Sequence, residues 1–211
     1  MRFANTIIGG FATDFICKPI IDTFFPSSCI CCGAWGGWLC RNHASLFKAE
    51  VALIEDEEGV AFGAYGGVLA EVIQAVKFRG ISAVQSELAG VLPARPESIA
   101  PGTVLVPIPI SRKRLSKRGF NQAKVIAQVL GRAWDLPVCN ALTRLDSHES
   151  QIGKGREQRL HAEHRFRVRG KLPASEIILV DDVRTTGATL EAAKLALGAT
   201  AMARYLVLAQ A

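Results

Sequence analysis

The sequence predicts an α/β fold, with a mostly parallel sheet flanked by helices and a small cysteine-rich extension at the N-terminus. Short apolar runs rich in β-branched residues at 103–110 and 177–180 are typical of buried parallel strands. They alternate with stretches of helical periodicity, which favours parallel strands joined by crossover helices. The extension is indicated by four of the six cysteines, which fall between residues 29 and 40. A chain of 211 residues is long enough for one large domain with such an appendage.

The N-terminal part of the chain predicts helices on either side of the cysteines. Apolar residues recur at helical spacing over 2–25, and Pro26-Ser27-Ser28 ends that helix. The acidic run Glu55-Asp56-Glu57-Glu58-Gly59 ends any regular element. We therefore expect a domain boundary there, with an extension of residues 1–58 and a main domain of residues 59–211. Helical periodicity returns over 65–78, and a second helix is expected over 82–92.

The main domain alternates strands and helices up to its C-terminus. A strand over 103–110 leads into a basic, glycine-terminated loop over 112–119 and an amphipathic helix over 120–134. A strand over 138–144 precedes a long polar loop over 145–155, and such loops are usually functional or disordered. The remaining elements are a helix over 156–164, strands over 166–168, 177–180 and 205–208, and a helix over 188–197.

Composition excludes two classes of protein. With 49% hydrophobic residues the chain is not disordered, and no stretch reaches the ~18–20 uninterrupted apolar residues of a membrane-spanning helix. The apolar segment 1–25 does not read as a signal peptide, because Asp14, Lys18 and Asp22 interrupt it and no small-residue cleavage pattern follows. We therefore expect a cytoplasmic protein without a membrane span.

Positive charge is concentrated in one region. The whole chain has 25 Lys and Arg against 19 Asp and Glu, a net charge of +6. Residues 107–170 alone hold 14 Lys and Arg against 5 Asp and Glu, a net charge of +9. Such a field attracts nucleic acid or a polyphosphorylated small molecule. Composition alone is equally consistent with a solvated basic surface.

The most informative motif joins a buried strand to two carboxylates and a hydroxyl-rich turn: Ile177-Ile-Leu-Val-Asp-Asp-Val-Arg-Thr-Thr-Gly-Ala-Thr189. Ligands of open parallel sheets bind at the carboxyl ends of the strands, so Asp181 and Asp182 are expected in a crevice, where they can accept hydrogen bonds from sugar hydroxyls. The turn over 184–189 presents backbone N–H groups and hydroxyls at a helix N-terminus, which favours phosphate. Gly187 lets the ligand approach the backbone closely. A helix cap would explain Asp182 or Thr185 singly, but not the whole motif.

The cysteine cluster predicts a metal site. The segments Cys29-Ile-Cys31-Cys32 and Cys40-Arg-Asn-His43 repeat one spacing and offer four soft ligands, Cys29, Cys32, Cys40 and His43, suited to tetrahedral zinc. Cys31 competes with them as a ligand. Reduced thiols in a site that has lost its metal are the alternative. A closed site of this kind would contribute folding energy rather than catalysis.

The motif over 177–189 resembles the phosphoribosyl pyrophosphate (PRPP) binding motif of type I phosphoribosyltransferases. A second segment, Val106-Pro-Ile-Pro-Ile-Ser-Arg-Lys-Arg-Leu-Ser-Lys-Arg-Gly-Phe-Asn-Gln-Ala123, follows a strand and would lie at the mouth of the same crevice. Arg114 and Arg118 are placed there to neutralise pyrophosphate, unless they form the solvated start of a helix. With this segment the chain is similar to the ComF family of phosphoribosyltransferase-like proteins linked to DNA uptake and natural competence. The similarity also covers the cysteine knuckle, Val76-Lys77-Phe78 and the loop over 151–159, which resembles the hood that closes over PRPP.

The resemblance implies a type I phosphoribosyltransferase fold with an N-terminal zinc-ribbon-like extension. It also implies transfer of a phosphoribosyl group from PRPP, with Mg²⁺, to an acceptor that the sequence does not identify. No residue can be named as general base. In the implied site, Asp181 and Asp182 hold the ribose hydroxyls, and Lys77, Arg114 and Arg118 meet the pyrophosphate. The 5′-phosphate is cradled by Thr185, Thr186, Gly187, Ala188 and Thr189.

A second hypothesis belongs to a different class of protein. The basic region, the cysteine knuckle and the family's link to competence also favour a non-catalytic factor that binds single-stranded DNA, works with the DNA-uptake machinery and retains a PRPP pocket. The sequence does not indicate the oligomeric state.

Overall fold

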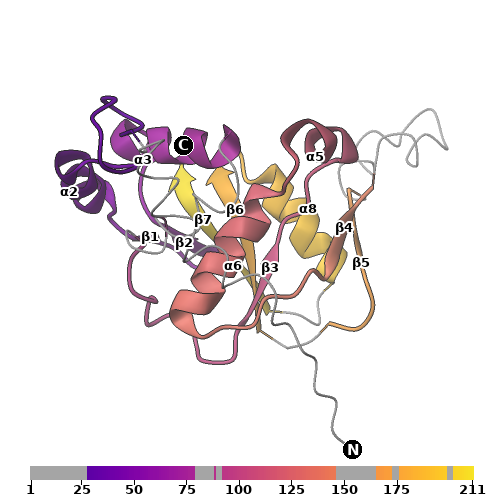
Figure 1. Cartoon of the computed structure of the whole chain (residues 1–211). Helices are drawn as coiled ribbons and strands as arrows, with labels where there is room; N and C mark the ends of the chain where they lie inside the picture. Colours follow the sequence, from indigo (N-terminus) through magenta and orange to yellow (C-terminus); the bar gives the residue numbers. More distant parts are fainter. Residues whose placement is uncertain (1–27, 79–87, 89–91, 146–164, 173–175, 199–201) are drawn as a thin grey trace, which may run out of the picture. The chain divides into compact units, whose positions relative to one another are not determined.

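The computed structural model describes residues 28–78, 88, 92–145, 165–172, 176–198 and 202–211 (Figure 1). The elements expected over 2–25, 82–92, 145–155 and 156–164 lie wholly or almost wholly outside these residues. The chain divides into two compact units, Met1–Ser45 and Leu46–Ala211. The domain boundary expected between residues 58 and 59 stays a prediction. No helix in the described ranges is long and apolar enough to cross a membrane.

Helix α2 (Arg41–Glu50) begins in the first unit and ends in the second. The other elements lie in the second unit and follow the expected alternation closely. They are β1 (Ile54–Glu55), β2 (Gly59–Ala61), α3 (Gly67–Phe78), β3 (Val104–Pro107), α5 (Arg112–Arg118), α6 (Gln122–Trp134), β4 (Leu142–Arg144), β5 (Phe166–Val168), β6 (Glu176–Arg184), α8 (Ala188–Leu197) and β7 (Met202–Gln210).

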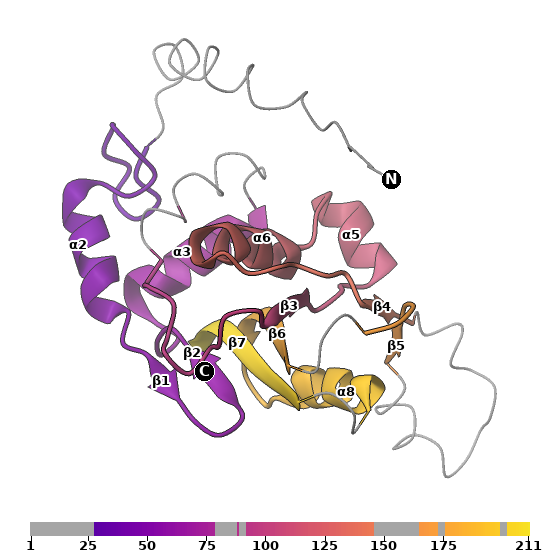
Figure 2. The same ribbon diagram turned by 90° about the horizontal axis from the view of Figure 1, so that it is seen from below.

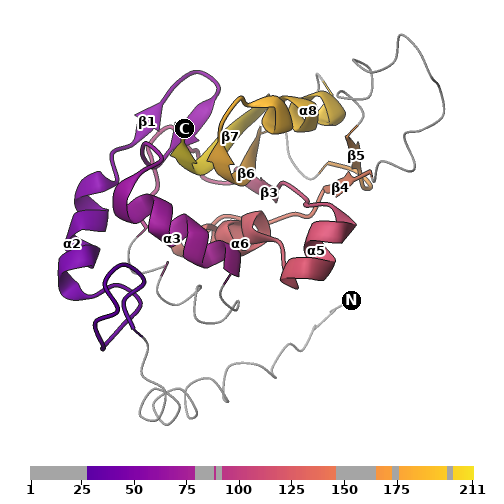
Figure 3. The same cartoon turned by 90° about the horizontal axis from the view of Figure 1, so that it is seen from above.

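The second unit is built on a five-stranded sheet with the order β1-β2-β7-β6-β3. Strand β6 pairs in parallel with β3 and with β7, and β7 pairs in parallel with β2; only the β1 and β2 pair is antiparallel. Helices α3 and α6 cover one face of the sheet and α8 covers the other (Figures 2 and 3). Strands β4 and β5 form a separate antiparallel pair. The predicted α/β fold with a mostly parallel sheet is confirmed.

The core under α8 follows from alternation along the two central strands. Every second side chain of β6 and β7 faces the same side of the sheet. Ile177 and Leu179 of β6, with Tyr205 and Val207 of β7, pack with the apolar face of α8 in one buried cluster. The same register fixes where the polar end of β6 emerges from the core.

The basic segment after β3 is a helix, so the loop expected over 112–119 is wrong. Ser111 accepts a hydrogen bond from the backbone N–H of Arg114, and Gly119 closes the helix with φ +77°. A side-chain cap at one end and a left-handed glycine at the other are sufficient for the two turns of α5. Its polar sequence carries no apolar face, which is why periodicity did not reveal it.

The acidic run lies in a hairpin that the sequence did not reveal. Strands β1 and β2 flank it, with Glu55 opposite Val60. One carboxylate oxygen of Asp56 accepts hydrogen bonds from the N–H groups of Glu58 and Gly59, both at 2.8 Å. The carboxylate therefore organises the turn that returns the chain into the sheet.

Gly59 is required by close packing and gives a test of this register. A Cβ atom at Gly59 would lie 2.2 Å from the backbone oxygen of Tyr205, whereas a Cβ at Gly66 would meet nothing within 4 Å. We expect Gly59→Ala to lower the free energy of unfolding by about 2 kcal/mol or more, because the strands must separate to admit the methyl group. Denaturant unfolding measures this, with Gly66→Ala as the matched control. Equal stability of the two variants would contradict the register.

Candidate functional site

Asp181 and Asp182 lie inside β6, which continues to Arg184, rather than after its end. Because successive side chains of a strand face opposite sides, the two carboxylates do not share one face. Asp182 lies 3.5 Å from Nζ of Lys77, at the end of α3. Each carboxylate also accepts the N–H of the following residue, from Asp182 at 2.9 Å and from Val183 at 2.8 Å. The structure thus brings together Lys77 and the acidic pair, which are far apart in sequence.

The carboxyl group of Asp181 has an unusual protonation equilibrium. Burial, together with the negative charge of Asp182, raises its pKa to about 7, while the positive charges of Lys77 and Arg144 oppose the rise. A carboxyl with such a pKa changes its protonation state near neutrality, which is typical of functional sites. It would be held in its charged form by any cation that binds beside it.

Helix α3 positions Lys77 through a contact at its other end. The carboxylate of Glu50 accepts a hydrogen bond of 3.0 Å from the backbone N–H of Leu69, in the first turn of α3. A carboxylate there compensates the positive end of the helix dipole, and a lysine in the last turn compensates the negative end. The buried face of the helix then fixes the position of Lys77 beside β6.

The turn between β6 and α8 leaves a helix N-terminus without a side-chain cap. Gly187 is the N-cap residue of α8, with φ +75°, and as a glycine it supplies no side-chain cap; the N–H of Ala188 donates only a long hydrogen bond to Thr186. Thr186 Oγ1 lies 3.4 Å from the N–H of Ala188, and Thr185, Thr186 and Ala188 are exposed. Unpaired N–H groups at the start of a helix are suited to an anion such as phosphate. The left-handed φ also explains why a glycine stands at this position.

Arg114 and Arg118 lie on α5, in the connection that follows β3. Arg114 is exposed and Arg118 is half-buried. Asn121 fixes this connection, because its side chain donates a 2.9 Å hydrogen bond to the backbone oxygen of Ile108 and accepts one from the N–H of Ala123. Among the described residues, no ion pair joins either arginine to the acidic pair. The structure therefore groups Lys77 with the carboxylates but not the two arginines.

Sequence reasoning missed Arg144, on β4. Its positive charge acts on Asp181, and its guanidinium lies 5.6 Å from the centre of the Phe166 ring. No motif surrounds this arginine. Only the pairing of β4 with β5, across a long segment of chain, gives it this position.

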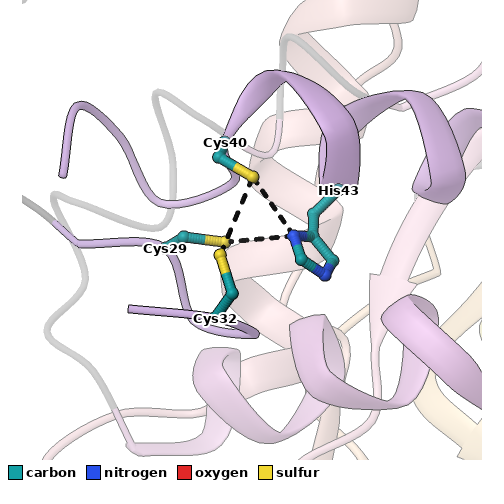
Figure 4. A group of neighbouring side chains, drawn as sticks. All are labelled: Cys29, Cys32, Cys40 and His43. Carbon is teal, nitrogen blue, oxygen red and sulfur yellow. Dashed lines mark hydrogen bonds between the residues drawn. The ribbon is translucent and has the colours of Figure 1, made fainter. Parts of the chain in front are cut away.

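The four predicted metal ligands converge in the first unit (Figure 4). The sulfur atoms of Cys29, Cys32 and Cys40 and a ring nitrogen of His43 all lie within 4.8 Å of one another. The distances are 3.9 Å between the Cys32 and Cys40 sulfurs and 3.6 Å from the Cys29 sulfur to Nδ1 of His43. A tetrahedral zinc ion with ordinary bond lengths separates such ligands by about 3.8 Å and about 3.5 Å. The donor set and its spacing fit one metal ion, and Cys31 is not part of it.

Backbone N–H groups favour the thiolate form of two of the three cysteine ligands, Cys29 and Cys40. Burial of the Cys29 thiol opposes ionisation, but the N–H groups of Cys40, Cys32 and Cys31 outweigh it and lower the pKa of Cys29 to about 6. The N–H of His43 similarly lowers the pKa of Cys40. Since thiolates are the metal-binding form of cysteine, these contacts favour the ligand state.

Comparison with known proteins gives the family. No protein-family model matches the chain. Competence protein F of Haemophilus influenzae is 30% identical over 185 residues, which cover 82% of this chain and 79% of that protein. The chain belongs to the ComF competence family. The resemblance inferred from the motifs is confirmed.

Two other relatives of this ComF-family chain are named for competence and for DNA utilization. Competence protein ComFC of Bacillus subtilis is 37% identical over 133 residues, which are 60% of this chain and 52% of that protein. The chain thus spans about half the length of that relative. DNA utilization protein YhgH of Escherichia coli O157:H7 is 31% identical over 91 residues, which are 41% of this chain and 39% of that protein.

The ligand geometry predicts about one metal ion for each copy of this chain. Cys40→Ser removes one of the four ligands and should lower the metal content of the purified protein by at least tenfold at limiting metal. Cys31→Ser should leave the content unchanged. Elemental analysis of protein purified without chelator measures both variants. A full complement of metal in Cys40→Ser, or its loss in Cys31→Ser, would contradict the assigned ligands.

Proposed function

We propose that this ComF-family protein binds PRPP with Mg²⁺ and transfers its phosphoribosyl group to an acceptor, in the cytoplasm of cells that take up or use DNA. The observation that carries the proposal is the uncapped start of α8 at Gly187, immediately after a strand that bears Asp181 and Asp182. A phosphate site and two carboxylates for a sugar are thereby joined by one short turn.

The chain's own groups would have separate tasks in this reaction. The N–H groups at the start of α8, with Thr185, Thr186 and Thr189, would bind the 5′-phosphate. Asp181 and Asp182 would hold the ribose hydroxyls. Lys77, with Arg114 and Arg118 on α5, would stabilise the negative charge that builds on the departing pyrophosphate.

The acidic pair also supplies donors for the proposed Mg²⁺. Carboxylate oxygens are the protein ligands that Mg²⁺ prefers, and the neighbouring residues Asp181 and Asp182, in the C-terminal half of β6, each bear one carboxylate. When bound, the ion would neutralise phosphate charge in the site. The raised pKa of Asp181 supports this, because a bound cation would stabilise the charged form of that buried carboxyl.

We further propose that the metal of the first unit is zinc with a structural role. Three thiolates and one imidazole form a closed, soft donor set that leaves no position open for a substrate. Such a site stabilises only the folded state. Removal of the metal by a chelator would therefore lower thermal stability.

Loss of the acidic pair should weaken PRPP binding. Replacing both residues, as in Asp181→Asn/Asp182→Asn, removes charge-assisted hydrogen bonds to the ribose, and we expect affinity for PRPP with Mg²⁺ to fall about tenfold or more. Calorimetry measures this, with Glu97→Gln as the control, since Glu97 is an exposed carboxylate in the connection before β3.

The same proteins, supplied with a panel of bases and amines, test catalysis through pyrophosphate release. Equal PRPP affinity in wild type and the double variant would refute the site. Binding without any pyrophosphate release would leave the non-catalytic alternative.

A second candidate function, binding of single-stranded DNA, is favoured by the placement of three arginines on and directly beside β5. Arg165, Arg167 and Arg169 are exposed at alternate positions, while Phe166 between them is buried. Helix α5, with five basic residues, lies beside the β4 and β5 pair in all three views. Neither segment contains an acidic residue. Such a surface is suited to a phosphate backbone, and its DNA would come from the uptake machinery.

Removal of Arg165, Arg167 and Arg169, on and beside β5, should flatten the salt dependence of DNA binding. Each phosphate contact to single-stranded DNA contributes a slope of about −0.7 to the log–log plot of affinity against salt. The triple variant Arg165→Gln/Arg167→Gln/Arg169→Gln should therefore reduce the slope by about 2 in magnitude. Fluorescence anisotropy with a labelled oligonucleotide measures it, and Lys48→Gln, on α2, is the control. An unchanged slope would show that β5 does not contact the DNA.

A further inference from the structure

We propose that Arg184 is a positioning residue for the phosphate turn and that the acidic turn between β1 and β2 holds Arg184 in place. The phosphate turn is the segment Thr185–Gly187, between β6 and α8. The inference rests on the proposed function in one respect, which is that the turn binds a phosphate. The contacts that carry it are independent of that function.

Arg184 is surrounded by partners that fix its guanidinium group. Nη1 lies 3.2 Å from a carboxylate oxygen of Asp56 and donates to the hydroxyl of Tyr205 at 2.7 Å. Nη2 lies 2.8 Å from a carboxylate oxygen of Glu58. The guanidinium also stacks over the Tyr205 ring, 4.7 Å from its centre. Two carboxylates, a hydroxyl and an aromatic face thus define one position for the group.

The partners of Arg184 are themselves fixed. The hydroxyl of Tyr205 donates a 2.8 Å hydrogen bond to Asp56, and the backbone N–H of Tyr205 donates to the oxygen of Glu58. Asp56 also accepts the N–H groups of Glu58 and Gly59. Burial and the hydrogen bond to Asp56 raise the pKa of Tyr205 to about 12, so the hydroxyl stays protonated and continues to donate.

The guanidinium lies against the phosphate turn. A Cβ atom at Gly187 would be 3.5 Å from Nε of Arg184, so the side chain passes directly beside the residue that starts α8. The backbone of Arg184 is also held, because its oxygen accepts a 2.9 Å hydrogen bond from the N–H of Ala211. Arg184 therefore supports the turn both through its side chain, beside Gly187, and through its fixed backbone.

The charges around Arg184 assign it a role in positioning the turn and not in binding phosphate. The guanidinium already faces two carboxylates, Asp56 and Glu58. An arginine neutralised twice has little charge to offer a phosphate, whereas its rigid, planar group is well suited to hold a turn. This also accounts for the acidic run of the sequence, which the proposed catalytic site does not use.

The hairpin supplies a matched control. Glu55, beside Asp56, forms an ion pair of 3.1 Å with Arg204 of β7. Both sets of contacts tie the hairpin to the rest of the sheet, but none of the contacts of Glu55 involves Arg184. Glu55→Gln should therefore affect the hairpin without affecting the phosphate turn.

Amide hydrogen exchange of the ligand-free protein tests the proposal without any ligand. In Asp56→Asn/Glu58→Gln we expect the amides of residues 185–190 to exchange about tenfold faster than in wild type, because local opening of the turn becomes easier. Arg184→Lys keeps one positive charge and should show a smaller acceleration. Glu55→Gln should match the wild type. Unchanged exchange in the double variant, or equal acceleration by Glu55→Gln, would overturn the positioning role.

Ligand affinity then separates this proposal from the proposed function. With ribose 5-phosphate as the probe, we expect affinity to fall about tenfold in Asp56→Asn/Glu58→Gln. With pyrophosphate as the probe, which would meet Lys77 and α5 instead, it should be nearly unchanged. If wild type binds neither ligand, the proposed function fails and hydrogen exchange still decides the role of Arg184. Equal losses for both probes would show that the network only supports the fold.

Discussion

The parallel pairing of β6 between β3 and β7 is the constraint on which the rest of the structure depends. Residues 177–180 are held on both sides by strands and are buried in the core. The pairing with β3 ends at Val180, and the pairing with β7 continues to Arg184. The polar end of β6 is thus paired on one side only. Both the site and the turn that follows it arise from this difference in strand length.

Local patterns predicted what depends on neighbours in sequence. The first and last residues of α8 and β5 were predicted correctly. The spacing of apolar residues indicates each element, and glycine or polar residues mark where it ends. The metal ligands were also predicted, since each pair is separated by two residues and such spacing brings the two side chains together. The open question about Cys31 needed coordinates, because its spacing to Cys29 and Cys32 does not decide which sulfurs converge.

Contacts between distant residues could not be predicted from such patterns. The resemblance to a family placed Asp182 and Lys77 in one site, but it did not predict the ion pair between them. Nothing near Asp56 in the sequence indicates that it meets Arg184, 128 residues away. The hairpin of β1 and β2 was missed because its strands are short. With two and three residues, they are too short for an alternation of apolar and polar side chains to be recognised. Helix α5 was missed because its stability comes from caps and not from an apolar face.

Each of three cations around β6 already faces carboxylates before any ligand is present, and this bears on how the site would work. Lys77 pairs with Asp182, Arg144 acts on Asp181, and Arg184 is neutralised by the hairpin. Lys77 lies 3.5 Å from a carboxylate oxygen of Asp182, and both side chains are 20% exposed. A pyrophosphate approaching the site would compete with Asp182 for the ammonium group, whereas the doubly held Arg184 would stay in place. In the proposed function, selectivity for a phosphosugar then has two parts. A rigid turn recognises the 5′-phosphate, and a cation that can exchange partners meets the leaving group.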